Sequence, residues 1–208
     1  MSNIDNSGFD KEIFDEISRL NNELANITRE LTKKNIELLK ANKKINELLK
    51  IDDLTGIANR RYFMEYFTKM HAIATRHNLP ITMAMADIDD FKAINDRYGH
   101  QAGDQVLKTF ANILKENSRE EDLPARYGGE EFLILLVFTN IEQGYQMTER
   151  IRKTFEEITE RKGPQKITAS FGLTGLKNDD TPGELINRAD QALYLSKNSG
   201  KNKTTVIN

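Results

Sequence analysis

The sequence predicts an α/β or α+β domain, in which helices cover one central sheet, preceded by a long coiled-coil helix. Residues 10–51 contain neither Pro nor Gly and carry apolar residues at helical spacing. From residue 51 onward, apolar runs typical of buried strands alternate with helical patterns. The chain of 208 residues is long enough for one ordinary domain with an appendage.

The apolar residues of the first segment repeat at alternating spacings of four and three, with one polar break at Lys34. They are Ile13, Ile17, Leu20, Leu24, Ile27, Leu31, Leu38, Ala41, Ile45 and Leu48. At 1.5 Å per residue such a helix is about 60 Å long, and one small domain offers no surface of that length. The narrow stripe therefore favours a parallel homodimer over packing on its own domain. We expect a disordered N-terminus (1–9), a coiled-coil dimerisation helix (10–51) and a globular domain (52–208).

The globular part divides into segments of different periodicity. Helical patterns with start signals, an Asn59 cap and a Thr181-Pro182 pair among them, predict helices at 59–78, 101–117, 141–161 and 181–199. Apolar runs predict strands at 81–88, 166–176 and 204–207. Residues 125–138 read as two short strands joined through the hairpin signal Gly128-Gly129.

Composition excludes several classes of function. The formal net charge of −2 provides no basic surface for nucleic acid. Cysteine is absent, so disulfides and thiolate metal sites are excluded. No apolar run approaches the roughly 20 residues needed to span a bilayer, and the N-terminus lacks the features of a secretory signal. We expect a cytoplasmic protein that binds neither nucleic acid nor membrane.

Carboxylates follow the predicted strand ITMAMADI (81–88) and the glycine pair. The apolar run of the strand stops at Asp87, and Asp89 and Asp90 follow at once. Glu130 and Glu131 come directly after the glycine pair. Two carboxylates brought close together repel unless they share a proton or bind a cation. Oxygen ligands without His or Cys favour Mg²⁺ or Mn²⁺. Alternate residues of a strand face opposite ways, so the two glutamates should differ in role. The short motif alone also fits an ordinary hairpin with solvated acids.

Further polar residues fit a nucleotide. Lys92, Lys197 and Lys201 suit a triphosphate beside a metal site, although each alone also fits a solvated surface charge. The Asn95 amide and the Asp104 carboxylate suit guanine, because a carboxylate accepts from its N1–H and 2-amino groups. Singly, Asn95 also fits a turn or cap residue, and Asp104 an acid in the first turn of a helix.

Five blocks in this order resemble the GGDEF domain of bacterial diguanylate cyclases. They are DDLTGIANRR (52–61), DIDDFKAINDRYGHQAGDQVL (87–107), RYGGEEF (126–132), ASFGLTG (169–175) and RADQALYLSKNSGKN (188–202). The resemblance covers roughly residues 50–208 and implies a palm-like fold, similar to nucleotidyl cyclases, with a central antiparallel sheet. It also implies the reaction of two GTP to cyclic di-GMP and two pyrophosphates, which makes 52–208 the GGDEF catalytic domain.

The resemblance implies a role for each motif residue. Asp87, Glu130 and the Ile88 carbonyl would bind two Mg²⁺ (or Mn²⁺) per active site, with Glu131 as a possible further ligand. Glu130 and Lys92 would be catalytic: Glu130 is named in the family as base for the 3′-hydroxyl, and Lys92 steadies charge in the transition state. The residues that would bind GTP are Phe91, Asn95, His100, Asp104, Lys197 and Lys201. Lys201 departs from the family pattern, which often has Arg there.

REED (119–122) lies at the spacing of the family's RxxD inhibitory site. The resemblance implies that Arg119 and Asp122 bind the product cyclic di-GMP, with Arg150 as a secondary arginine. Such a site would give product inhibition. A four-residue match of this kind also occurs by accident in surface loops.

One site binds one GTP while the product joins two, so by analogy with the family two domains must face each other. The coiled coil would raise the local concentration of the second domain.

Three other functions compete with an active cyclase. They are a catalytically weak GGDEF domain that acts as a receptor for GTP or cyclic di-GMP, a coiled-coil adaptor with a structural globular part, and a cyclase that acts on a single nucleotide.

Overall fold

The computed structural model describes residues 6–48, 50–162 and 165–208, with some side chains near the ends of these ranges left out. The chain divides into two compact units, residues 1–49 and 50–208. The first contains one helix, α1 (Asn6–Leu48), and the second contains every other element. The division into a coiled-coil dimerisation helix (10–51) and a catalytic domain (52–208) stays a prediction.

Helix α1 is 43 residues long, so the predicted long helix is present. It starts before residue 10: residues 6–9, expected to be disordered, are helical, and residues 1–5 lie outside the described residues. Polar residues and Gly8 are tolerated there because the first helical turn forms no N–H hydrogen bonds within the helix. The large apolar side chains of the described part are exposed: Ile17, Leu20, Leu24, Ile27, Leu31, Ile36, Leu38 and Leu39.

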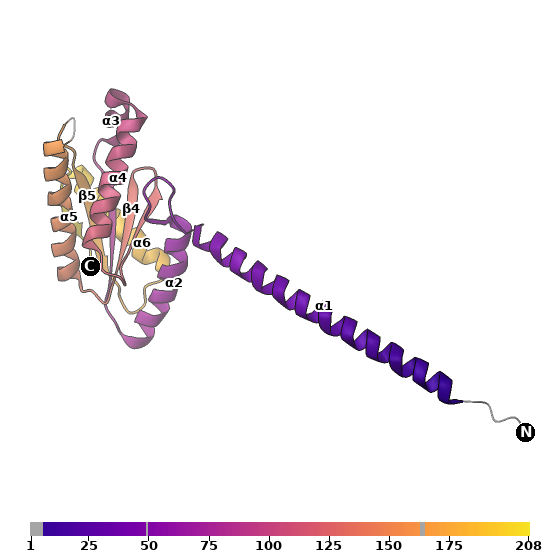
Figure 1. Cartoon of the computed structure of the whole chain (residues 1–208). Coiled ribbons are helices and arrows are strands. Elements are labelled where there is room, and N and C mark those ends of the chain that lie inside the picture. Colours follow the sequence, from indigo (N-terminus) through magenta and orange to yellow (C-terminus); the bar gives the residue numbers. More distant parts are fainter. Residues whose placement is uncertain (1–5, 49, 163–164) are drawn as a thin grey trace, which may run out of the picture. The chain divides into compact units, whose positions relative to one another are not determined.

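The second unit is built on one sheet of six strands in the order β1-β3-β4-β2-β5-β6. Figure 1 shows the arrangement. The strands are β1 (Ala58–Asn59), β2 (Ile81–Ile88), β3 (Leu123–Gly128), β4 (Glu131–Val137), β5 (Ala169–Gly175) and β6 (Thr204–Val206). The four central strands are antiparallel, which confirms the expected sheet, and the two short edge strands pair in parallel.

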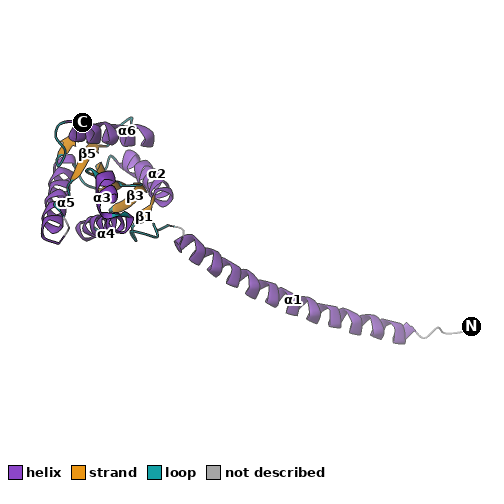
Figure 2. Cartoon of the chain, turned by 90° about the horizontal axis from the view of Figure 1, so that it is seen from above, coloured by secondary structure: helices purple, strands orange, loops and turns teal. Residues whose placement is uncertain are grey.

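Helices cover both faces of this sheet (Figure 2). One face packs on α3 (Phe91–Tyr98), α4 (His100–Asn117) and α5 (Ile141–Lys162), and the other on α2 (Arg60–His77) and α6 (Pro182–Asn198). Alternation along β2 produces the two cores, because Ala84, Ala86 and Ile88 join the first and Ile81, Met83 and Met85 the second. Strand β2 is buried on both faces, as its continuous apolar run predicts.

Two of the predicted helix starts are confirmed by their caps. The Asn59 side chain accepts a hydrogen bond from the Tyr62 N–H at 3.0 Å. At α6, Thr181 and Glu184 form a capping box, and Pro182 is the first helical residue. Local side-chain chemistry therefore fixes both helices that cover the second face of the sheet.

Helix α3 and strand β1 were not predicted. Helix α3 has only eight residues, too few for periodicity to stand out, and it follows Asp90 in the left-handed conformation with φ of 55°. Strand β1 is two residues long; it pairs in parallel with β3, and Ala58 also bridges Ile51. Both elements depend on tertiary contacts that local patterns do not encode.

Helix α6 approaches the sheet closely at Gly172 of β5. A Cβ added there would lie 2.1 Å from the Ala189 carbonyl oxygen and 2.1 Å from the Leu193 backbone nitrogen. Only glycine leaves room for two backbones at this distance. The contact sets the position of α6, whose last turn carries Lys197.

Candidate functional site

The predicted acidic residues meet at one end of the central strands. Asp87, near the end of β2, lies opposite Glu131, the first residue of β4. The Ile88 N–H donates to the Glu130 carbonyl at 3.4 Å. Residues Asp87, Ile88, Glu130 and Glu131 are therefore brought together by strand register, although 42 positions separate Ile88 from Glu130 in the sequence.

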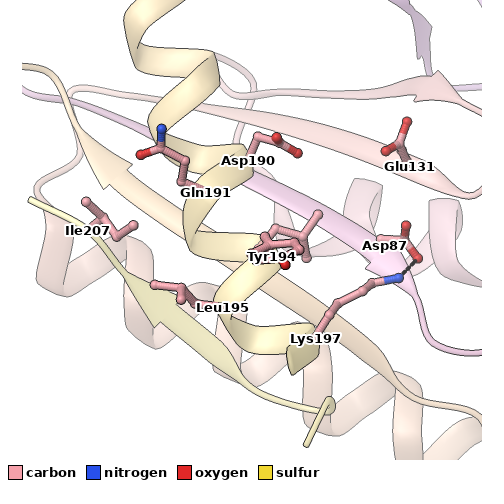
Figure 3. Close-up of a pocket in the computed structure, with 9 residues that line it drawn as sticks. Asp87, Glu131, Asp190, Gln191, Tyr194, Leu195, Lys197 and Ile207 are labelled. Carbon is pink, nitrogen blue, oxygen red and sulfur yellow. Dashed lines mark hydrogen bonds and ion pairs between the residues drawn. The ribbon is translucent and has the colours of Figure 1, made fainter. Parts of the chain in front are cut away.

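The hairpin turn gives the two glutamates different settings. Gly129 has φ of 51°, the left-handed region that favours glycine, and the register shifts between Arg126 and Gly128. Glu130 lies in the turn before β4 begins, whereas Glu131 is a strand residue beside Asp87 on the α6 side of the sheet (Figure 3). The expectation that the two carboxylates differ in setting is met by this turn rather than by strand alternation alone.

Burial and neighbouring negative charges raise the pKa values of two carboxyl groups in this cluster, Asp87 and Glu131. Burial raises the pKa of Asp87 to about 6, Lys197 acts against this rise, and the charges of Glu130 and Glu131 add to it. Burial also raises the pKa of Glu131, with further contributions from Asp190 and Glu130. Carboxylates crowded in this way require positive charge to stay ionised near neutral pH.

Lys197 supplies such a charge. Its ammonium from α6 forms an ion pair with the Asp87 carboxylate (Figure 3). A cation thus lies against the residue expected to bind metal, and the nearby donors are hard oxygens. Among the described residues, no three His, Asp or Glu side chains gather as a metal site. The residues nevertheless fit Mg²⁺, which usually takes one or two carboxylates and completes its shell with water and phosphate.

The loop after β2 is anchored by Asp89. This buried carboxylate accepts hydrogen bonds from Thr168 and Ser170, each at 2.7 Å, and from the Asn202 N–H at 3.1 Å. Asp90 pairs with Lys201 at 2.5 Å and makes no side-chain cap for α3. Phe91 begins the same helix, and the exposed Lys92 is its second residue. Asp89 is therefore structural, and it holds the loop that joins the acidic cluster to α3.

The residues expected to read guanine lie between α3 and α4. Gly103 of α4 leaves room for the Asn95 side chain, because a Cβ there would lie 1.9 Å from the Asn95 Oδ1 and 3.1 Å from the Phe91 Cζ. Asp104 follows Gly103, and His100 begins the same helix. The structure brings Asn95 and Phe91 of α3 against Gly103 of α4. Sequence reasoning missed Gly103 because a small residue carries no chemistry of its own.

A cavity of about 520 Å³ opens on the α6 side of the carboxylates (Figure 3). It is lined by Asp87, Glu131, Asp190, Gln191, Leu193, Tyr194, Leu195, Lys197 and Ile207. Asn95 and Asp104 belong to helices on the opposite face of the sheet. The cavity and the residues expected to bind guanine therefore belong to opposite faces of the sheet.

Arg126 supports the hairpin turn from outside the cluster. It donates to the Gly129 carbonyl at 2.9 Å and to the Asp52 carboxylate at 3.2 Å. Asp52 also accepts from the Thr55 backbone and hydroxyl at 2.9 and 2.6 Å. The first residues of the domain are therefore tied to the turn that carries Glu130.

The expected product-binding residues lie near one another at the end of α4. Arg119 is exposed, and Arg150 of α5 donates to Asn117 Oδ1 at 2.8 Å. Asp122 is buried and accepts from the backbone N–H groups of Arg119 and Val137 at 3.0 and 3.1 Å. Both oxygens of Asp122 thus already have a structural function.

Within the described ranges, none of the helices has the combination of length and apolar character required to cross a membrane.

Comparison with known proteins agrees with this geometry. "Probable diguanylate cyclase DgcT" from Escherichia coli K12 is 42% identical over 160 residues, covering 74% of this chain and 35% of DgcT. The "Response regulator PleD" from Caulobacter vibrioides NA1000 is 40% identical over 161 residues, covering 75% of this chain and 36% of PleD. The chain thus spans about a third of the length of these two curated relatives.

A solved structure is similar over both units. The coiled coil and GGDEF domain of DgcB from Caulobacter crescentus, in complex with c-di-GMP, has a TM-score of 0.75 and 30% identity. The similarity covers 90% of this chain and 99% of that one. Residues 49–203 match the sequence model of the family described as "Diguanylate cyclase, GGDEF domain". By this match, by its relatives and by its fold, the chain belongs to the GGDEF domain family.

Proposed function

We propose that this chain is a diguanylate cyclase that condenses two GTP into cyclic di-GMP and two pyrophosphates. The observation that carries the proposal is the meeting of Asp87, Glu130 and Glu131 at one end of β2 and β4, with Lys197 against Asp87. Each 3′-hydroxyl attacks the α-phosphorus of the other GTP, so two P–O bonds form and two pyrophosphates leave. GTP is an intracellular substrate, and we place the reaction in the cytoplasm.

Asp87, Glu130 and the Ile88 carbonyl would hold two Mg²⁺ or Mn²⁺ ions, with Glu131 as a possible further ligand. When bound, they would lower the pKa of the 3′-hydroxyl and neutralise the leaving pyrophosphate. The raised pKa of Asp87 supports this assignment, because a crowded carboxylate gains most from a cation. Glu130, half-buried in the turn before β4, would act as base for the 3′-hydroxyl, as the family assignment has it.

The nucleotide would lie from the acidic cluster toward α3 and α4. Asn95 and Asp104 would bind guanine, with Phe91 and His100 beside them. The backbone of residues 89–92 and the lysines Lys197 and Lys201 would hold the phosphates, and Lys92 would neutralise charge that develops in the transition state. Lys197 and Lys201 are already held at the site by ion pairs with Asp87 and Asp90.

The reaction needs two such domains, and we propose that α1 pairs them as a parallel coiled coil. The exposed seam of Ile17, Leu20, Leu24, Ile27 and Leu31 supports this, because apolar side chains in one stripe gain by burial against a second copy. We further propose that cyclic di-GMP inhibits the enzyme by binding Arg119, Asp122 and Arg150. The approach of Arg150 to the end of α4 supports a shared site.

The test is the nucleotide product formed from GTP and Mg²⁺ by the full chain after removal of bound nucleotide, separated by chromatography. We expect cyclic di-GMP from the unaltered chain and a loss of at least about 100-fold for Glu130→Gln, which removes a metal ligand. Glu160→Gln, a change at an exposed glutamate of α5, is the matched control and should retain full activity.

Two results would contradict the proposal. Full turnover by Glu130→Gln would contradict the assignment of Glu130 as a metal ligand. Tight binding of GTP or cyclic di-GMP without any product, at all protein concentrations, would favour the receptor function instead.

A further inference from the structure

The loop between α6 and β6 has an unusual backbone. Gly200, Lys201 and Asn202 all have positive φ, at 110°, 59° and 47°. A left-handed backbone is disfavoured for side chains other than glycine, and asparagine tolerates it better than lysine does. Two such residues in a row persist only where contacts from outside the loop hold them.

Asn202 receives these contacts. Its Oδ1 accepts from Arg152 Nη1 at 2.7 Å, and its backbone N–H donates to the buried Asp89 at 3.1 Å. The pKa of Glu156 lies below its ordinary value, chiefly through a hydrogen bond from Lys166 and less through one from the Asn202 side chain. The amide oxygen of Asn202 is thus held from α5, and its backbone N–H from the loop after β2.

Arg152 is the centre of the hydrogen-bond network that holds Asn202. Its guanidinium donates to both oxygens of Glu149, each at 2.9 Å, to Glu156 at 3.2 Å and to Asn202. The side chain is 11% exposed. Thr204, at the other end of the loop, donates to Glu149 at 2.8 Å. A planar guanidinium fixed by two carboxylates has little freedom, so the second N–H of its Nη1 points at Asn202 in one direction.

The residue held in place is Lys201. Its backbone N–H donates to the Ser196 carbonyl at 3.0 Å, and its Nζ reaches Asp90 at 2.5 Å, beside the start of α3. The direction of the Lys201 side chain follows from the left-handed backbone at 201 and 202. If Asn202 left that conformation, the stem of Lys201 would turn away from Asp90.

We propose that Arg152 is a positioning residue for GTP binding, acting through Asn202 on the phosphate-binding Lys201. This inference rests on the proposed function in one respect, namely that Lys201 contacts the phosphates of GTP. Arg152 itself touches no substrate: it belongs to α5, and its contacts are to Glu149, Glu156 and the loop.

The test compares Arg152→Gln, Asn202→Gly and the double variant in the full chain. Asn202→Gly keeps the left-handed backbone accessible while removing the amide that Arg152 holds. Lys166→Gln is the matched control. It removes the ion pair between Lys166 and Glu156, a residue of α5 like Arg152, and among the described residues Lys166 itself makes no hydrogen bond or ion pair with residues 200–202. The readouts are KM and kcat for GTP, and amide hydrogen exchange over residues 199–204.

We expect KM for GTP to rise roughly three- to tenfold in each single variant, as for one hydrogen bond, with kcat within about twofold. Exchange over 199–204 should become faster in both. The double variant should be no worse than Arg152→Gln, because both changes break one connection. Lys166→Gln should change neither readout.

Unchanged KM and unchanged exchange in both single variants would overturn the inference, and so would an equal rise of KM in Lys166→Gln. If Arg152→Gln does not fold, Asn202→Gly decides alone. Failure of the proposed function can be distinguished from failure of this inference. In that case the unaltered chain would form no product from GTP. Hydrogen exchange over 199–204 would still report whether Arg152 orders the loop.

Discussion

Arg126 is joined to Asp52, 74 residues earlier in the chain, by two hydrogen bonds at 3.2 and 3.4 Å, and this ion pair is mostly shielded from solvent. The same guanidinium donates to the Gly129 carbonyl. The pair therefore connects the first residues of the domain to the hairpin turn. Burial alone would raise the pKa of Asp52, but hydrogen bonds from Thr55 and the charge of Arg126 hold it below its ordinary value.

Arg126→Gln should lower the free energy of unfolding by about 1–3 kcal/mol, because it leaves a partly buried carboxylate without its ion partner. It should also reduce turnover of GTP, since the turn that carries Glu130 loses its support. Urea denaturation and initial rates measure the two effects. Asp52→Asn and the double variant complete a cycle, and strict additivity of the two losses would show that the pair does not act as a unit.

Asp87→Asn should stabilise the chain near neutral pH while abolishing turnover. The pKa of Asp87 in the fold, about 6, lies above its ordinary value of 3.8. Stability from this group is therefore fully present below pH 3.8 and is lost as pH rises through 6. We expect a gain of about 1 kcal/mol at pH 7.5, less than the full shift implies because Asp87 is partly solvated and pairs with Lys197.

The measurement is urea denaturation of both proteins in a chelating buffer at pH 7.5 and at pH 4. The gain should shrink toward zero at the lower pH, where Asp87 is largely protonated. A gain that is the same at both pH values would mean that ionisation of Asp87 is not its source.

Gly103→Ala should weaken GTP binding without unfolding the domain. The new Cβ would overlap the Asn95 Oδ1, the end of a side chain that can move aside, so the helix persists but Asn95 leaves its place. We expect KM for GTP to rise roughly tenfold, as for the loss of one good hydrogen bond to guanine. Gly183→Ala, at an open position in the first turn of α6, is the control and should leave KM unchanged. Equal KM values in both variants would contradict the guanine assignment of Asn95.

Residues differ in how far the sequence alone reveals their function. Asn59 and Thr181 cap their helices through partners three residues away, so local patterns were enough to predict both starts. Asp87 and Glu130 are far apart in the sequence, but strand and turn signals place both at the end of a strand. The supporting contacts lie beyond such patterns. Arg126 bonds to Asp52 across 74 positions and Arg152 to Asn202 across 50, and neither pair shares a period or a turn.

Leu24→Glu combined with Leu31→Glu should abolish dimerisation through α1. Both side chains are more than 60% exposed in the single chain and lie at equivalent heptad positions, where two copies would bring like charges together. Sedimentation velocity should show monomers, and the rate per domain should fall steeply on dilution. Leu39→Glu is the control, because Leu39 is equally exposed but lies outside the seam. Dimers that survive the double change would exclude this seam as the dimer interface.

Substitutions at Arg119 and Asp122 should affect product inhibition and folding stability to different degrees. Asp122→Ala removes a buried carboxylate that accepts from two backbone N–H groups, so unfolding should become easier by about 1–3 kcal/mol. Arg119→Ala changes an exposed side chain and should alter stability by less than about 0.5 kcal/mol. It should nevertheless weaken inhibition by cyclic di-GMP at least roughly tenfold, because a guanidinium to a guanine or phosphate is a charge-assisted contact. Rates at increasing product concentration, with the exposed Glu120→Ala as control, measure this effect. Inhibition that persists unchanged in Arg119→Ala would mean that residues 119–122 serve only to join α4 to β3.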